Sequence, residues 1–153
     1  MIDKLIEDLI KSRAIFLALK DELTINFIKY DSWWSWVTRK ADGKTESKCV
    51  EITHKEKQIN IWLDAKLPSY TCTIWTTNAL LIAMTCAFDK TIYQQLSKFY
   101  SALEFMSTKY GDLSFMIEKN CWSGEMAEVI GKEMAATNDT LSFFKENYER
   151  LLK

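Results

Sequence analysis

The middle third of the chain constrains the fold most, because short runs of Trp, Val, Ile and Thr alternate there with polar residues. From Ser32 to Thr76 such runs are separated by polar clusters, a texture typical of β-strands. In one run, Val50 and Ile52 would face one side of a sheet while their neighbours face the other. The alternation predicts a sheet with one face toward a core and one toward water.

Four strands are expected in this region, arranged as an antiparallel meander. They are assigned to residues 33–39, 48–53, 58–63 and 70–76. Asp42 and Gly43 form the strongest hairpin-turn signal, because glycine accepts the positive φ that such turns require. The polar residues 54–57 would form the next turn.

Helical periodicity flanks the predicted sheet on both sides. Apolar residues at helical spacing predict a long N-terminal helix over residues 2–28, with a kink near Lys20 and Asp21. A second clear helix begins at the capping residue Asp89 and stops near Gly111. Further helices are expected over residues 79–88, which could instead extend a buried strand, over 123–134, and from 138 or 139 to 151.

The predicted fold class is therefore α+β, with an N-terminal helix, a four-stranded antiparallel meander and C-terminal helices packed on one face of the sheet. The 153 residues are expected to form a single globular domain, 1–153. With 48% hydrophobic and 27% charged residues, the composition is that of a folded chain and excludes a disordered one.

Charge and cysteine content restrict the class of partner. A formal net charge of -1 and a pI near 5.9 disfavour nucleic-acid binding by charge neutralisation. The four cysteines are too widely spaced for a zinc site or a secreted disulfide scaffold, so we expect reduced thiols and a cytoplasmic protein. The uncharged stretch 67–88 is interrupted by Pro68 and polar residues, so no membrane association is expected.

Sequence signatures of catalysis are mostly missing, including a phosphate-binding loop, a nucleophile elbow and a zinc-protease motif. The single histidine, His54, falls in a polar turn and is expected to be solvated, and Cys49 need not converge with it. Glu125, Glu128 and Glu133 are expected on a solvated helix face. We therefore expect no catalytic residue, metal ligand or cofactor, and an enzyme is not favoured.

Tryptophan is unusually frequent, with six residues in the chain. Strand alternation would place Trp34 and Trp36 on the core face and Trp33 on the opposite one. Trp62 also falls opposite to the core-facing isoleucines of its strand. Exposed tryptophan is enriched where proteins dock, because its large rigid ring buries much area at little entropic cost. The expected partner-binding residues are Trp33, Trp62, Lys57 and Glu51.

The preferred function is that of a non-enzymatic intracellular protein-binding module, and a toxin-neutralising inhibitor of the immunity or antitoxin type is its narrower form. The alternative is a small-molecule-binding domain or unusual enzyme with an aromatic-lined pocket between sheet and helices. Binding of single-stranded nucleic acid on stacked aromatics ranks third and would depend strongly on salt.

Overall fold

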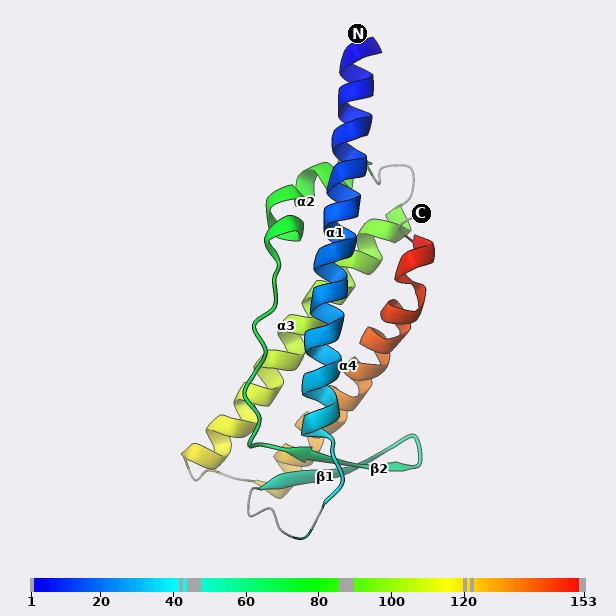
Figure 1. Cartoon of the computed structure of the whole chain (residues 1–153). Helices are drawn as coiled ribbons and strands as arrows, with labels where there is room; N and C mark the ends of the chain where they lie inside the picture. The colour runs from blue at the N-terminus through cyan, green and yellow to red at the C-terminus, as the bar shows by residue number, and fades with distance from the viewer. Residues whose placement is uncertain are drawn as a thin grey trace.

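The protein is mostly helical and contains one two-stranded antiparallel sheet, so the predicted four-stranded meander is wrong (Figure 1). The computed structural model describes residues 2–41, 43, 48–85, 90–119, 121 and 123–151. The elements are helix α1 (Ile2–Val37), strands β1 (Cys49–His54) and β2 (Lys57–Trp62), and helices α2 (Thr73–Thr85), α3 (Lys90–Glu118) and α4 (Gly124–Leu151).

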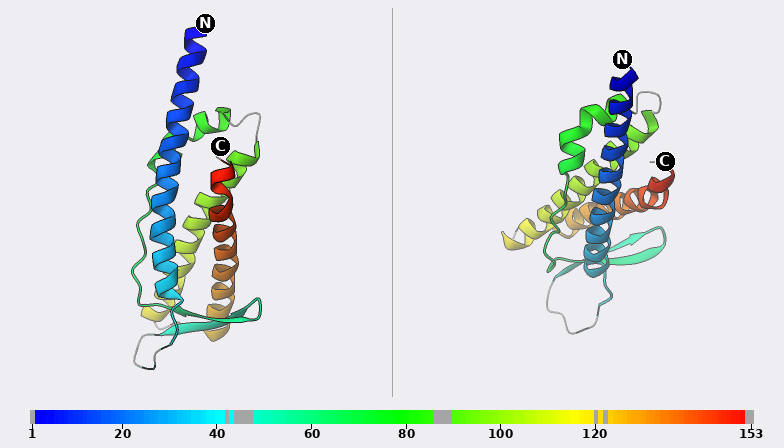
Figure 2. Two further views of the ribbon diagram at one scale, coloured as in Figure 1. Left: turned by 45° about the vertical axis from the view of Figure 1, so that its right-hand side comes forward. Right: turned by 45° about the horizontal axis from the view of Figure 1, so that its top comes forward.

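The three long helices α1, α3 and α4 run lengthwise, and the β-hairpin lies across one end of them (Figures 1 and 2). The short helix α2 packs against α1, and an extended segment connects the hairpin to α2 along the side of α1. The N-terminal part of α1 projects beyond every other element in all three ribbon views. The molecule is thus an elongated helical body with one protruding helix end.

Residues 33–37 belong to α1, which corrects the first predicted strand and extends the predicted helix 2–28 without a break at Lys20. From Leu19 onward, the buried side chains of α1 recur about every three or four residues, as a packed helix face requires. They include Leu19, Leu23, Tyr30, Trp33 and Val37. Tryptophan and valine favour strands when half-buried, but packing of this helix face outweighs that preference.

The fourth predicted strand is also wrong, because α2 begins at Thr73. Its first turn is capped by α1: the Glu22 carboxylate accepts hydrogen bonds from the amides of Ile74 and Trp75, at 2.9 and 3.2 Å. A carboxylate satisfies the unpaired amides at a helix N-terminus and interacts favourably with the helix dipole. The cap lies about fifty residues from the helix it starts, where local sequence cannot show it.

The two central predicted strands are confirmed as the β1–β2 hairpin, with Val50 opposite Ile61 and Ile52 opposite Ile59. Their turn is at Lys55 and Glu56, whose φ angles of 49° and 67° are positive. Of the expected Asp42–Gly43 turn, Asp42 lies outside the described residues. Gly43 has φ of 72° but lies in the chain that joins α1 to β1.

The C-terminal helices are longer and fewer than expected. α3 continues through Gly111 to Glu118, because Leu113 and Met116 extend its buried face beyond the glycine. α4 is one helix where two were predicted, and Asn138 accepts a hydrogen bond from the Tyr30 hydroxyl at 2.7 Å instead of starting a helix. The expected cap Asp89 lies outside the described residues.

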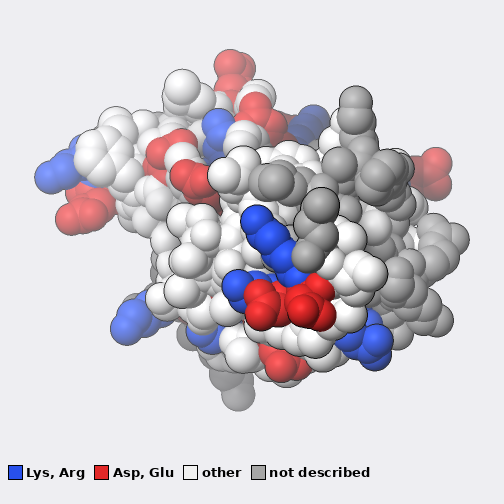
Figure 3. All heavy atoms as spheres, turned by 90° about the horizontal axis from the view of Figure 1, so that it is seen from above, with Lys and Arg blue, Asp and Glu red and all other residues white. Residues whose placement is uncertain are grey.

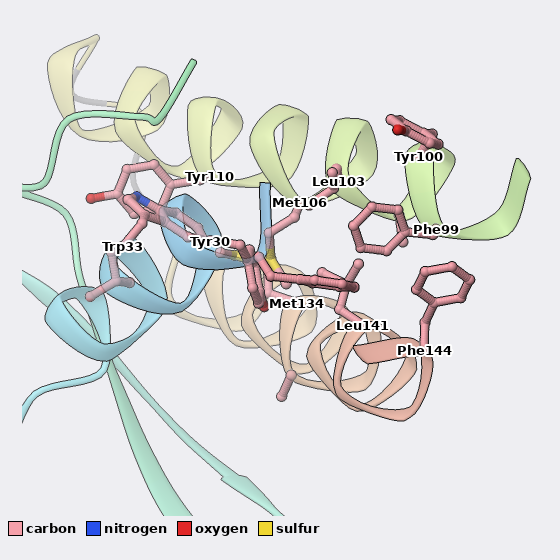
Figure 4. Packing of buried hydrophobic residues seen from close by; sticks show 14 of the residues in the cluster. Tyr30, Trp33, Phe99, Tyr100, Leu103, Met106, Tyr110, Met134, Leu141 and Phe144 are labelled. Atoms are coloured by element: carbon pink, nitrogen blue, oxygen red, sulfur yellow. The ribbon is translucent and has the colours of Figure 1, made fainter. Parts of the chain in front are cut away.

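Aromatic side chains from α1, α3 and α4 fill the core (Figure 4). Phe99 of α3 stacks on Phe144 of α4 with ring centroids 4.7 Å apart, and Trp33 meets Tyr110 edge-on at 5.1 Å. Such pairs add about 0.5–1.5 kcal/mol beyond their buried area. Of the helices in the described part of the chain, none contains a sufficiently long apolar stretch to cross a bilayer.

Candidate partner-binding groove

A groove of about 550 Å³ lies between the C-terminal half of α1 and the segment that follows β2. Its lining includes Lys29, Ser32, Trp33, Trp36, Lys66 and Pro68. Four of these residues come from successive turns of one face of α1, and the extended segment supplies the opposite wall. The groove is therefore formed by one face of α1 and by the segment that follows β2.

Trp36 is the exposed aromatic residue of this groove, with 55% of its surface accessible. The Arg39 guanidinium lies over its ring, 4.2 Å from the centroid, and also over the Trp62 ring at 4.8 Å. Arg39 forms a two-pronged ion pair with Asp64, with distances of 3.2 and 2.7 Å. Stacking and the planar fork together fix the guanidinium, and so restrict the Trp36 ring.

Buried hydrogen bonds hold the same corner from beneath. The Trp62 indole Nε1–H donates to the Arg39 carbonyl at 2.9 Å, and the Tyr110 hydroxyl donates to the Trp62 carbonyl at 2.8 Å. The Tyr110 hydroxyl also accepts from the Ala65 amide at 3.1 Å. Burial is the main cause that raises the pKa of Tyr110, so its proton stays available for donation. The groove is built on ordered elements.

The charges at the groove are predominantly positive. The Asp64 carboxylate is paired with Arg39, whereas the Lys29 ammonium donates to the neutral carbonyl of Ser69 at 2.7 Å. Lys66 is exposed on the groove. Trp33 also lines the groove, but its indole Nε1–H is buried and has no acceptor in the described part of the chain. An anionic ligand group would suit this arrangement.

The structure contradicts the exposure expected for Trp33 and Trp62, which retain only 6% and 5% of their accessible surface. Trp33 lies on the packed face of a helix, where strand alternation does not apply. Trp62 does face away from the core isoleucines, as expected, but Arg39 and the chain beyond α1 cover it. Trp36, which the sequence placed in the core, is the exposed residue; helical numbering from Trp33 and Val37 would have found it.

Lys57 and Glu51 are exposed on the hairpin, as expected, but they lie apart from the groove. Lys57 lies opposite His54 in the register of the hairpin, beside the turn, whereas Trp62 lies at the other end of the same strand. Five residues of a strand span about 17 Å. The structure therefore does not gather the four predicted residues into one surface.

His54 is partly buried and not simply solvated: its Nε2 lies 2.7 Å from Asp139 Oδ2 on α4. Lys55 Nζ lies 3.0 Å from the same oxygen. Burial alone would raise the pKa of Asp139, but hydrogen bonds from His54 and Lys55 outweigh it and hold the pKa below its ordinary value. This cluster ties the hairpin to α4.

Cys49 stands at the opposite end of β1 from His54, so the two side chains do not converge. Burial, with a smaller effect of Glu51, raises the pKa of the Cys49 thiol and disfavours a thiolate nucleophile. Glu128 and Glu133 form ion pairs with Lys132 and Lys109, at 3.1 and 3.2 Å, as side chains on a solvated face do.

Comparison of the chain with protein-family models, with curated proteins and with solved structures gave no significant match. Its function is therefore argued from the geometry of its own residues.

Proposed function

We propose that the protein is a binding module that holds an acidic, extended segment of another protein in the groove beside Trp36. The observation that carries this proposal is the exposed Trp36 ring, restrained by Arg39 and placed next to two lysines. The surface expected from the sequence, Trp33 and Trp62 with Lys57 and Glu51, is replaced by this groove because its two tryptophans are buried.

The anchor has the properties of an interaction hot spot. A tryptophan that is 55% exposed offers a large apolar surface, and its restraint by Arg39 lowers the entropy lost on binding. Pro68 and the methylene groups of Lys29 extend this apolar surface into the groove. A partner side chain could therefore pack on the exposed part of Trp36.

The charge of the groove determines which kind of partner segment it would bind. Because Asp64 is paired with Arg39, Lys29 and Lys66 leave the groove positive, although the whole chain carries a formal net charge of -1. Aspartate or glutamate side chains of a partner would gain from these lysines, chiefly in association rate and orientation.

A toxin-neutralising inhibitor is the narrower form of this proposal. It is supported by the small size of the chain and by its shortage of catalytic motifs. Under this form, the toxin would present an acidic segment to the groove, and substitution of Trp36 would abolish neutralisation without unfolding the inhibitor.

The test is selection of displayed random peptides on the immobilised full chain, followed by titration of the best synthetic peptide against purified variants. We expect enrichment of peptides that carry Asp or Glu next to an apolar residue. Trp36→Ala should weaken their binding at least about 10-fold, the loss typical of an interface hot spot. A Lys29→Glu/Lys66→Glu variant should weaken it further and reduce its salt dependence.

Phe115→Ala is the matched control, because Phe115 is 56% exposed on α3 and does not line the groove. It should bind selected peptides as the unchanged chain does. Selection of basic peptides, or equal binding by the Trp36 and Phe115 variants, would contradict the proposal. Binding of small carboxylates with no peptide preference would favour the small-molecule alternative instead.

A further inference from the structure

The hydroxyl of Tyr110 joins two backbone groups on either side of Asp64. It donates a hydrogen bond to the Trp62 carbonyl at 2.8 Å and accepts one from the Ala65 amide at 3.1 Å. Tyr110 is only 1% exposed, and its hydroxyl oxygen points out of the aromatic core in Figure 4. One buried hydroxyl of α3 therefore fixes the short stretch of chain that carries Asp64.

Asp64 connects this stretch of chain to Arg39 and Trp36. Its carboxylate accepts two hydrogen bonds from the Arg39 guanidinium, at 3.2 and 2.7 Å. The guanidinium also donates to the Trp36 carbonyl at 3.0 Å and lies 4.2 Å from the centroid of the Trp36 ring. Because a guanidinium fork binds a carboxylate in one plane, the position of the carboxylate determines that of the guanidinium. It thereby also determines how firmly the Trp36 ring is held.

These contacts form one series that runs from the buried Tyr110 to the exposed Trp36. We propose that Tyr110 is the positioning residue of the groove, and that its hydroxyl acts through Asp64 and Arg39 to hold the Trp36 ring ready for a partner. The expected effect on binding rests on the proposed function, whereas the expected effect on the motion of Trp36 does not. Tyr110 itself does not line the groove, so its hydroxyl acts on a bound segment only through these contacts.

The ring and the hydroxyl of Tyr110 have separate roles. The ring meets Trp33, which lines the groove, edge-on at 5.1 Å. Tyr110→Phe keeps this ring contact and removes only the hydroxyl, so the Trp62 carbonyl and the Ala65 amide lose the group that joins them. The stretch that carries Asp64 is then less restrained. A surface that must become ordered on binding loses affinity, because the ordering costs free energy.

The first measurement needs no ligand: it is the order parameter of the Trp36 indole N–H, from nitrogen relaxation of the full chain. In Tyr110→Phe we expect this order parameter to fall toward about 0.6 or below, which is typical of flexible groups. Tyr30→Phe is the matched control, because it also removes one buried hydroxyl, whose acceptor is Asn138 on α4. Both variants should lower the melting temperature by about 3–10 °C, but only Tyr110→Phe should loosen Trp36.

The second measurement is titration of the selected acidic peptide in a double-mutant cycle. Tyr110→Phe should weaken peptide binding about 3- to 10-fold, the cost of ordering one or two side chains. In the Asp64→Asn background the same change should weaken it less than about 2-fold, because the hydroxyl then has no ion pair to position. Tyr30→Phe should bind the peptide as the unchanged chain does.

The positioning role would be overturned by an order parameter of Trp36 that Tyr110→Phe leaves unchanged. Equal losses of affinity in the Tyr110 and Tyr30 variants, or the same loss with and without Asp64, would also overturn it. Failure of the proposed function has a different signature, namely that no acidic peptide binds or that Trp36→Ala binds it normally. In that case the order parameter still decides whether Tyr110 positions Trp36.

Discussion

The two halves of α1 have the same apolar spacing but different surroundings. From Leu19 to Val37 the apolar seam, which is the face of α1 that packs into the core, is buried among α3, α4 and the hairpin. Its continuation at Ile2 and Leu5 is open to water, at the end of the molecule that Figure 3 views from above. Periodicity thus defines which face of a helix is apolar, but the length of the neighbouring elements decides how much of that face is buried. The covered half stabilises the fold through burial, whereas the open half buries little apolar surface.

The largest effect should come from truncating the seam in each half. Leu23→Ala removes a side chain with no exposed surface, and should lower the free energy of unfolding by about 2–5 kcal/mol through lost burial and a cavity. Leu5→Ala should change it by less than about 0.5 kcal/mol in dilute protein. Urea denaturation followed by circular dichroism measures both, and equal losses would contradict the division of α1 into two halves.

The polar contacts of the buried half should have the next largest effect. Glu22 is 3% exposed and caps α2 while accepting the Tyr100 hydroxyl at 2.6 Å. Glu22→Gln replaces one acceptor oxygen by a donor and should cost about 1–3 kcal/mol of unfolding free energy. The exposed neighbour provides the control: Asp21→Asn should fall within about 0.5 kcal/mol, and a similar loss in both would show that the cap is unimportant.

Close packing of α4 on the hairpin gives a smaller effect. A Cβ at Gly131 would lie 2.9 Å from Ile52 Cγ2, so Gly131→Ala should cost about 1–3 kcal/mol in overpacking, partly offset by about 1 kcal/mol of helix propensity. Gly111→Ala meets nothing within 4 Å and should stabilise the protein by up to about 1 kcal/mol. Thermal unfolding measures the stability of both variants, and a gain of stability in both would contradict the close approach of Gly131 to Ile52.

The smallest effect concerns pH. The pKa of Asp139 is lowered below its ordinary value of 3.8, so its contribution is present above that value and is lost as pH falls through the lower folded-state pKa. Because Asp139 is 40% exposed, solvent screening limits the contribution to about 0.5 kcal/mol. The stability difference between the unchanged chain and Asp139→Asn should therefore shrink below pH 4 in urea titrations, and a difference that grows would contradict this ion cluster.

The parts of the fold that depend on local pattern were predictable. The hairpin strands and residues 2–28 of α1 follow from alternation and helical spacing, which are visible within a short window. The strand expected at Trp33–Arg39 was wrong because β-propensity was weighed above a helical spacing that continues to Val37. The strand expected at 70–76 was wrong because the cap that starts α2 is Glu22, far away in sequence.

The exposed tryptophan was predicted at the wrong positions. A tryptophan-centred surface was expected, and one exists, but it is formed by Trp36 and not by Trp33 or Trp62. The wrong tryptophans were predicted to be exposed because a helix and a strand expose different members of the same Trp-rich run. The covering of Trp62 by Arg39 depends on where α1 ends, which sequence alone did not reveal.

Residue-resolved amide hydrogen exchange along α1 tests the difference between its two halves most directly. We expect slow exchange over residues 23–37 and fast exchange over residues 2–12, which project beyond the other elements. Fast exchange over residues 33–37, or slow exchange over residues 2–12, would contradict this account of α1.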